Sequence, residues 1–240
     1  MDFTFTEDQQ LFQDSVRDFL VNEVTPERVR ASWEIDSGRD DALWSQLAEL
    51  GLTGITVPEE HGGLGMTELD FVLLAQECGY VALPEPLVHT ALVSVPVLGK
   101  IGGDLAAQWL PRIAAGEAKV IVGVEQNELV EDAHVADLMI LQQGENVVAA
   151  TPDQVTLRFN ESVDPSRKLF AVDISPDATV VASGAEAVIL VEAALNNGAL
   201  GSAAQALGLA QRMIDISVQY TSERHQFGKP ILASYTAFQK

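Results

Sequence analysis

The chain has 240 residues, of which 47% are hydrophobic and 20% charged, so it can bury a sizeable core and has an ordinary globular composition. Its 35 acidic residues against 14 lysines and arginines give a formal net charge of −21, which argues against nucleic-acid partners and anionic membrane surfaces. The single cysteine, Cys78, excludes an intrachain disulfide and a cysteine-cluster metal site and suits a reducing cytoplasm.

Helical patterns begin close to the first residue, where no basic or apolar stretch of a signal peptide is apparent. Residues 6–9 read as a capping box, and the apolar positions that follow keep helical spacing until Pro26 ends the segment. A second helix is expected from Asp41 to Leu50, with Gly51 in the C′ position.

Two further helical segments are expected before residue 117. Residues 67–70 form another capping box, which opens a helix to about Val81. After an apolar stretch over residues 87–98, Asp104 is expected to cap a last helix that Gly116 closes. Residues 1–116 are therefore predicted to form an all-helical domain.

A glycine-rich connector and two histidines interrupt this helical region. Residues 51–65 contain repeated glycines and one proline, which mark an irregular loop. His61 and His89 have no acidic or histidine neighbour at ligand spacing, so both are interpreted as structural or surface residues and no metal site is predicted.

The pattern of apolar residues changes at Lys119 from helical spacing to short runs. Short apolar or alternating runs, separated by turn residues, are typical of small antiparallel strands; they cover residues 120–124, 138–141, 147–148, 155–159, 169–172 and 180–181. A small antiparallel β domain is thus predicted over residues 117–183.

A long apolar segment follows, from about Ala185 to Ser222. A stripe at spacings of three and four favours one helix; it comprises Leu200, Ala203, Ala204, Leu207, Ala210, Ile214 and Val218. The Asn196–Gly198 turn signal leaves a kink as the alternative, although tertiary packing often overrides a penalty of roughly 1 kcal/mol for glycine. Polar residues at 186, 192, 196 and 197 make this segment a poor membrane span.

Residues 231–240 begin what is expected to be another helix. A helical pair that stops there leaves a wide apolar face uncovered. Either the sequence is a fragment of a longer polypeptide, which we favour, or a partner chain covers that face.

The segment that joins these two helices contains the most specific motif in the chain. Arg224 offers a planar charged fork suited to a phosphate or pyrophosphate, Gly228 permits a tight turn, and Pro230 stops the helix. Taken alone, this is a capped helix end with a surface arginine. The spacing of residues 220–231, with Arg224, Gln226, Phe227, Gly228 and Pro230 in place, however resembles the signature of the acyl-CoA dehydrogenase family.

Other stretches agree with that resemblance in the same order. The loop over residues 51–65 is similar to the family's N-terminal glycine-rich loop, and residues 164–168 resemble a late turn of its middle β domain. The family's Thr-Glu-Pro-x-x-Gly-Ser-Asp segment, which lies against flavin and substrate, is absent after Val124, so the β domain is expected to be shortened. The resemblance implies an α+β fold in which residues 184–240 form the first long helix and the start of the second helix of a C-terminal bundle.

The resemblance also implies a cofactor and a reaction. FAD would accept a hydride from the β-carbon of an acyl-CoA thioester while a glutamate removes the α-proton. By the motif, Arg224 contacts the FAD pyrophosphate, and Gln226, Phe227 and Gly228 shape the adenine and diphosphate side of a flavin held mainly by a neighbouring subunit. The family's helix-borne glutamate aligns at or next to Gly198, Glu192 is about six residues away, and the family's other position lies beyond Lys240. No catalytic base is therefore named.

Three hypotheses follow. The complete protein is an FAD-dependent acyl-CoA dehydrogenase in a homo- or hetero-oligomer with shared flavin sites, or it is a non-catalytic subunit that completes another subunit's flavin site. The shortened β domain and Gly198 favour the second, which resembles the smaller subunits of bacterial heteromeric enzymes, some of them acting on steroid side chains. A helical scaffold without flavin is the third. We also expect that electron-transfer flavoprotein or a similar protein accepts the electrons. The expected location is cytoplasmic, with no nucleic-acid or membrane partner.

Overall fold

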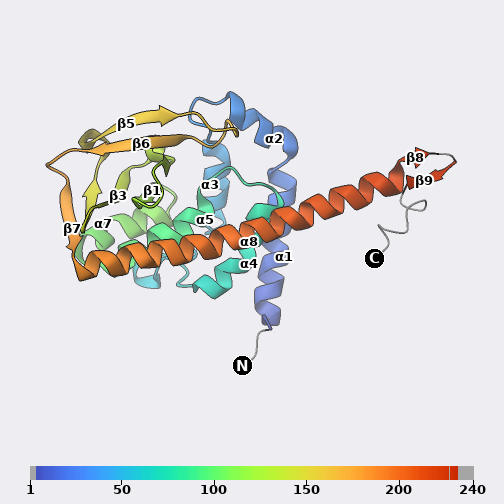
Figure 1. The fold of residues 1–240 in the computed structure, drawn as a ribbon. Helices are drawn as coiled ribbons and strands as arrows, with labels where there is room; N and C mark the ends of the chain where they lie inside the picture. The colour runs from blue at the N-terminus through green and yellow to red at the C-terminus, as the bar shows by residue number, and fades with distance from the viewer. Residues whose placement is uncertain (1–3, 227, 232–240) are drawn as a thin grey trace.

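The computed structural model describes residues 4–226 and 228–231. Helices form the first part of the chain (Figure 1): α1 (Glu7–Glu23), α2 (Pro26–Ala31), η1 (Ser32–Glu34), α3 (Asp41–Glu49), η2 (Glu59–His61), α4 (Glu68–Tyr80), α5 (Leu87–His89), the π-helix η3 (Thr90–Ser94), α6 (Val95–Ile101) and α7 (Gly103–Ala114). Strands follow: β1 (Val120–Gly123), β2 (Val130–Glu131), β3 (Leu138–Gln143), β4 (Asn146–Ala150), β5 (Val155–Asn160), β6 (Leu169–Ile174) and β7 (Thr179–Ser183), with η4 (Ala133–Val135) and η5 (Pro152–Gln154) between them. The long helix α8 (Ala185–Glu223) and the short strands β8 (His225–Gln226) and β9 (Lys229–Pro230) complete the described chain.

Local capping signals account for several helix boundaries. Both predicted capping boxes are present, at Thr6 before α1 and at Thr67 before α4. α3 ends as expected at Leu50 and Gly51, where Gly51 has a φ of 75° and the Leu52 N–H donates to the Leu47 carbonyl at 3.0 Å. This bonding satisfies carbonyl groups that the end of a helix leaves free.

Two helix signals act differently from the prediction. Pro26 follows the end of α1 but also begins α2, with Thr25 as its N-cap, because proline has no N–H to lose in a first helical turn. The prediction that Asp104 caps α7 is wrong: Gly102 is the N-cap, without a side-chain bond, and Asp104 lies in the first turn.

The strands form two main sheets that pack on each other. One has the order β1-β3-β4-β7 and the other β2-β6-β5. Alternate residues of β3 face opposite layers: Leu138 and Ile140 pack with α6, α7 and α8, whereas Met139 and Leu141 face the second sheet. Every strand run expected from the sequence is a strand, but β1 pairs with β3 in parallel, so the sheet is not purely antiparallel.

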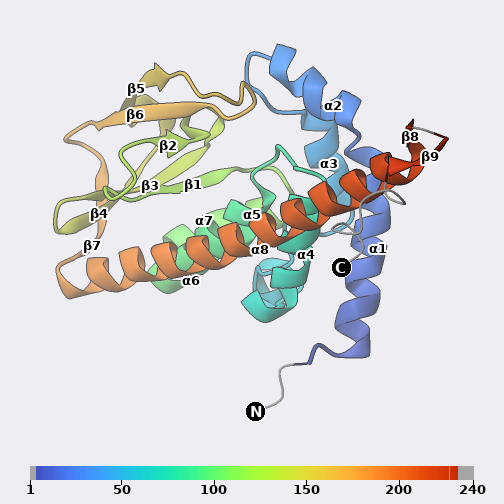
Figure 2. The ribbon, with the colours of Figure 1, turned by 45° about the vertical axis from the view of Figure 1, so that its right-hand side comes forward.

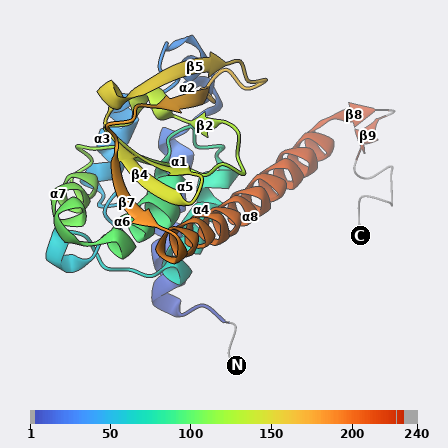
Figure 3. The same cartoon turned by 60° about the vertical axis from the view of Figure 1, so that its left-hand side comes forward.

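α8 is one uninterrupted helix of 39 residues, as favoured from the sequence. It runs along the sheet and the helical region and then projects beyond them (Figures 1 and 3). Its buried residues are mostly small: Gly208 packs on the backbone of α4 at Gln76 and Tyr80, and Gly201 packs against Val88 and Leu92. Of the apolar stripe noted in the sequence, only Ala204 is buried.

The projecting half of α8 exposes apolar side chains, as expected for the uncovered face. They include Leu207, Met213, Ile214, Ile216, Val218 and Tyr220. α8 is the one helix in the described part of the chain whose length and composition alone would allow it to cross a membrane, a test that core helices also pass. The helix expected over residues 231–240 lies outside the described residues, except Ile231.

Candidate functional site

A two-lobed cleft lies between α8, α5 and the edge of the β layer (Figure 2 shows these elements side by side). The first lobe has a volume of about 570 Å³ and extends between α8 and the β1–β2 connection. The second, about 560 Å³, extends toward the loop before α5 and residues 164–167. His89, Glu131, Arg167 and Gln205 line both lobes, so the two form one site.

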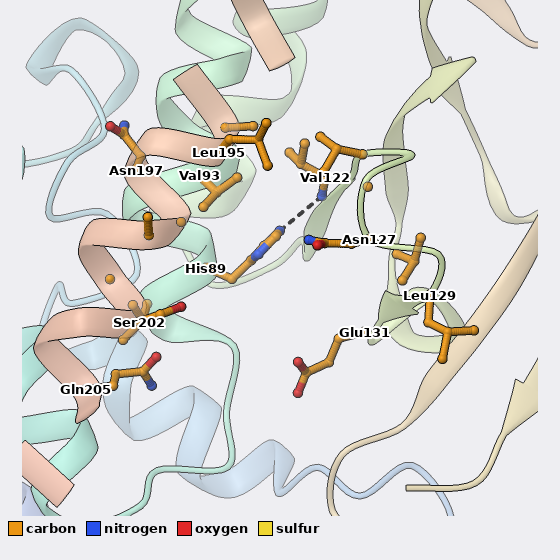
Figure 4. A pocket seen from close by; sticks show the side chains of 18 of the residues that line it. His89, Val93, Val122, Asn127, Leu129, Glu131, Leu195, Asn197, Ser202 and Gln205 are labelled. Carbon is orange, nitrogen blue, oxygen red and sulfur yellow. Dashed lines mark hydrogen bonds between the residues drawn. The ribbon is translucent and has the colours of Figure 1, made fainter. Parts of the chain in front are cut away.

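His89 stands on the floor of the cleft, where its Nε2 accepts a hydrogen bond from the Val122 N–H at 3.0 Å (Figure 4). β1 is an edge strand, so no neighbouring strand accepts a hydrogen bond from the Val122 N–H, and the imidazole takes that place. Burial lowers the pKa of His89 to about 4, which keeps the ring neutral near pH 7. The sequence interpretation of His89 as a structural residue is therefore correct, but it did not place the residue in a cleft.

An ion pair stands where the lobes join. Arg167 donates from Nε to Glu131 Oε1 at 3.0 Å and from a terminal nitrogen to Glu131 Oε2 at 2.7 Å. The bidentate geometry holds both side chains in place, and the Glu131 carboxylate raises the pKa of Arg167 further. Neither charge is free for a ligand without breaking this pair.

A second, buried ion pair underlies the second lobe. Arg39, from the loop before α3, donates to Asp132 and, at 2.9 Å, to the Ser166 carbonyl. Asp132 has a left-handed backbone with a φ of 62°. Burial raises the pKa of Asp132 to about 6, and the Arg39 charge opposes that shift. This contact joins three segments that are far apart in the sequence.

Glu85 lines the second lobe beside that pair. Its Oε1 accepts from the Asp40 N–H at 2.7 Å, whereas its buried Oε2 has no partner among the described residues. Burial raises the pKa of Glu85 to about 7. The side chain is thus a carboxyl group poised between its neutral and charged forms near physiological pH.

The position where the resemblance places a helix-borne base lies in the first lobe. Gly198 lines that lobe, and a Cβ there would lie 3.8 Å from the nearest atom, Val93 Cγ2. Glu192 is exposed and does not line the cleft. No carboxylate of α8 therefore reaches the cleft from the described residues.

The motif residues predicted to bind FAD lie at the far end of α8. His225 and Gln226 pair with Lys229 and Pro230 in a hairpin, and Gly228 turns it with a φ of 81°. Phe227 lies outside the described residues. The structure thus brings Arg224, Gln226 and Gly228 together, but away from the cleft.

Arg224 is exposed and its guanidinium carbon lies 5.5 Å from the centre of the Tyr220 ring. No ion pair to Arg224 is found within residues 4–226 and 228–231. A planar guanidinium at the base of the hairpin that carries Lys229 has the charge and shape that a pyrophosphate needs, so the residues present fit this part of FAD. Groups of three or more histidine, cysteine or acidic residues able to hold a metal do not occur in the described part.

Two family models and several known proteins match this chain. A family model described as acyl-CoA dehydrogenase, N-terminal domain, matches residues 6–117, and one described as acyl-CoA dehydrogenase, C-terminal domain, matches residues 188–237. The chain is 31% identical over 227 residues to acyl-CoA dehydrogenase IpdE2 of Mycolicibacterium smegmatis, covering 94% of this chain and 68% of that protein.

Solved structures show the same fold. The ChsE4–ChsE5 complex from Mycobacterium tuberculosis matches with a TM-score of 0.80 at 20% identity, over 99% of this chain and 72% of the other. An acyl-CoA dehydrogenase complexed with FAD from Bacillus anthracis matches with a TM-score of 0.82 at 21% identity, over 98% of this chain and 47% of the other.

Proposed function

Because this chain belongs to the acyl-CoA dehydrogenase family, we propose that it is a subunit of an FAD-dependent enzyme that introduces an α,β double bond into an acyl-CoA thioester. The bound FAD supplies the hydride acceptor for this reaction. The cleft between α8 and the β layer is the place for the acyl group, and the hairpin at the end of α8 serves a flavin site shared between subunits.

The position of Arg224 carries this proposal. Arg224, the C-cap of α8, follows Leu209, the last residue of this helix that lines the cleft, by 15 positions, which at about 1.5 Å per residue is roughly 22 Å along the helix axis. A guanidinium that far away cannot act in the cleft of its own chain. Its exposure at the end of α8, a helix that projects from the rest of the chain (Figure 1), supports binding to the anionic part of a cofactor in a neighbouring subunit.

A non-catalytic role within such an assembly is the second candidate, and two observations favour it. Gly198 provides no base, and both oxygens of Glu131 accept hydrogen bonds from Arg167 in a bidentate pair, so they are not free to take a proton from a substrate. The chain would then complete the flavin site of a different subunit. The fold it shares with the ChsE4–ChsE5 complex, which is built from two different chains, supports a hetero-oligomer.

The remaining parts of the proposal follow from the reaction. The substrate is an acyl-CoA thioester, and reoxidation of the flavin requires electron-transfer flavoprotein or a similar acceptor. With a net charge of −21 and one cysteine, the chain suits the cytoplasm.

Arg224→Ala tests the proposal, with Arg158→Ala as a matched control at another exposed arginine. The complete protein is purified alone and with a co-expressed dehydrogenase subunit, and flavin is measured by visible absorption. Arg224→Ala is expected to weaken flavin retention by roughly 1–3 kcal/mol, the range for a hydrogen bond to a charged group, while Arg158→Ala does not.

The same preparations separate the two roles. Flavin and turnover in the lone protein indicate an autonomous dehydrogenase, and flavin only with the partner indicates a completing subunit. Unchanged flavin content in Arg224→Ala removes the hairpin from the cofactor site.

A further inference from the structure

The first lobe of the cleft carries polar side chains that the chain itself leaves unsatisfied. Asn127 lines it from the β1–β2 connection, and Ser202 and Gln205 line it from α8 (Figure 4). No side-chain hydrogen bond to any of these three is found within the described residues. A cavity made only for a hydrocarbon chain gains nothing from such groups, because they lose water when the chain enters.

His89 adds a donor of fixed orientation. Since Nε2 accepts from the Val122 N–H, a neutral ring must carry its hydrogen on Nδ1. Among the described residues His89 Nδ1 has no acceptor. The fully buried side-chain atoms without a partner in this part of the chain are Arg39 Nε, Glu85 Oε2, Thr90 Oγ1 and His134 Nδ1. His89 Nδ1 is not among them, so it is not fully buried. His89 Nδ1–H is therefore accessible from the cleft and free to donate.

The charges around the cleft indicate the kind of acceptor. Arg167, which lines both lobes, is paired with Glu131, and Asp132 is paired with Arg39. The remaining acidic groups of the second lobe, Glu85 and Asp164, have no ion pair within the described residues. A ligand carboxylate at this point would meet net repulsion. A neutral hydroxyl or carbonyl oxygen accepts a hydrogen bond without that cost.

We propose that the cleft selects acyl-CoA thioesters whose acyl group carries a hydroxyl or carbonyl oxygen beyond the thioester, and that His89 Nδ1–H donates a hydrogen bond to that oxygen. This inference rests on the proposed function, since it takes the cleft as the acyl site. An unsubstituted acyl group would strip water from His89 and its polar neighbours without replacing it. A site built around such groups rejects the ligand that lacks the matching atom.

Two substitutions at His89 separate its structural role from its role in specificity. His89→Gln places an amide oxygen where it can still accept from Val122 but removes the donor at the Nδ1 position. His89→Asn keeps an amide donor near the Nδ1 position and gives up the bond to Val122. His61→Gln is the matched control, because His61 lies outside both lobes.

The test measures binding of matched thioesters to the complete protein with its partner subunit, by calorimetry and independently of turnover. The probes are linear, cyclohexyl and steroid side-chain acyl-CoA esters, each unsubstituted and with one added hydroxyl, keto or carboxylate group. The hydroxyl or keto member of at least one set is expected to bind about 10- to 100-fold more tightly than its unsubstituted counterpart. His89→Gln should abolish that ratio, and His89→Asn and His61→Gln should retain it.

Equal binding of substituted and unsubstituted esters overturns the inference while leaving the proposed function in place. A preference for the carboxylate esters, or a ratio that His89→Gln does not change, overturns it as well. If no thioester binds, the cleft is not an acyl site and the proposed function fails with the inference. Loss of flavin retention in Arg224→Ala is measured separately and does not depend on any of these results.

Discussion

Replacing Gly208 by alanine should destabilise the protein, although alanine is the better helix former. A Cβ at Gly208 would lie 1.8 Å from the Gln76 carbonyl oxygen and 2.7 Å from the Tyr80 backbone nitrogen on α4. The approach is reciprocal, because a Cβ at Gly79 would lie 2.0 Å from the Gln205 carbonyl oxygen on α8. The two helices therefore touch through their backbones, and neither atom belongs to a side chain that can rotate away.

The magnitude follows from two opposing terms. Alanine in a helix interior gains up to about 1 kcal/mol over glycine. Against this, α4 and α8 must separate by about 1 Å at Gly208, which breaks the close packing of both helices, and overpacking of this kind costs roughly 1–3 kcal/mol or more. Because the overlap is with backbone, we expect the upper part of that range and a net loss of about 2 kcal/mol.

Gly198→Ala is the control on the same helix. Its nearest neighbour would be 3.8 Å away, so only the gain in helix propensity remains, up to about 1 kcal/mol. Urea denaturation followed by circular dichroism should place Gly208→Ala about 2 kcal/mol below the wild type and Gly198→Ala slightly above it. Equal stability of the two variants would refute the account of the α4–α8 packing.

Two further predictions concern the buried charges of the second lobe. Arg39→Met leaves the Asp132 carboxylate buried without its partner, so urea denaturation should show a loss of roughly 3–5 kcal/mol, and an unchanged midpoint would contradict this. Glu85 has its pKa raised from 4.5 to about 7, so the native state binds a proton that the unfolded state has released, and wild-type stability falls as the pH rises from 4.5 to 7. Glu85→Gln should therefore be more stable than the wild type above pH 7, by up to about 3 kcal/mol, with the difference disappearing near pH 4.5; a difference that does not vary with pH would argue against the raised pKa.

The sequence allows prediction of those parts of the fold whose causes are local. Thr6 and Thr67 each meet their partner three residues later, so a short window contains the whole capping interaction. Alternating apolar residues likewise locate the strands, because the period of two belongs to the strand itself. The prediction failed for Asp104, since Gly102, with a φ of 65°, already provides the turn into α7.

Strand pairing could not be obtained in this way. β1 pairs with β3 in parallel because the chain between them, which includes β2 and η4, carries it back across the edge of the sheet. No residue within β1 or β3 encodes that direction. It results from where the connection packs, and this depends on Phe170 and other residues distant in the sequence.

The two parts of the candidate site also differ in whether the residues that form them are close together in the sequence. The Arg224–Gly228 hairpin is contained in one short motif, so its residues could be named from the sequence. The cleft is assembled from α5, the β1–β2 connection, residues 164–167 and α8. The partner of His89 is a backbone N–H on Val122, and a backbone group leaves no signature in the sequence, so its role was visible only in the fold.

α8 connects these two parts mechanically. Its first half belongs to the core shared with the β layer, through Ala187, Leu190 and Ala194, and Gly208 fixes its crossing with α4. From Gly208 the helix extends 16 positions to Arg224, roughly 24 Å at about 1.5 Å per residue. Over that length a tilt of about 5° displaces the guanidinium by roughly 2 Å, enough to break a hydrogen bond that tolerates only a few tenths of an ångström. The small residues on the buried face of α8 therefore do more than allow close packing: they set the direction in which the helix projects, and with it the position of Arg224, for which we propose a role in the flavin site of a neighbouring subunit.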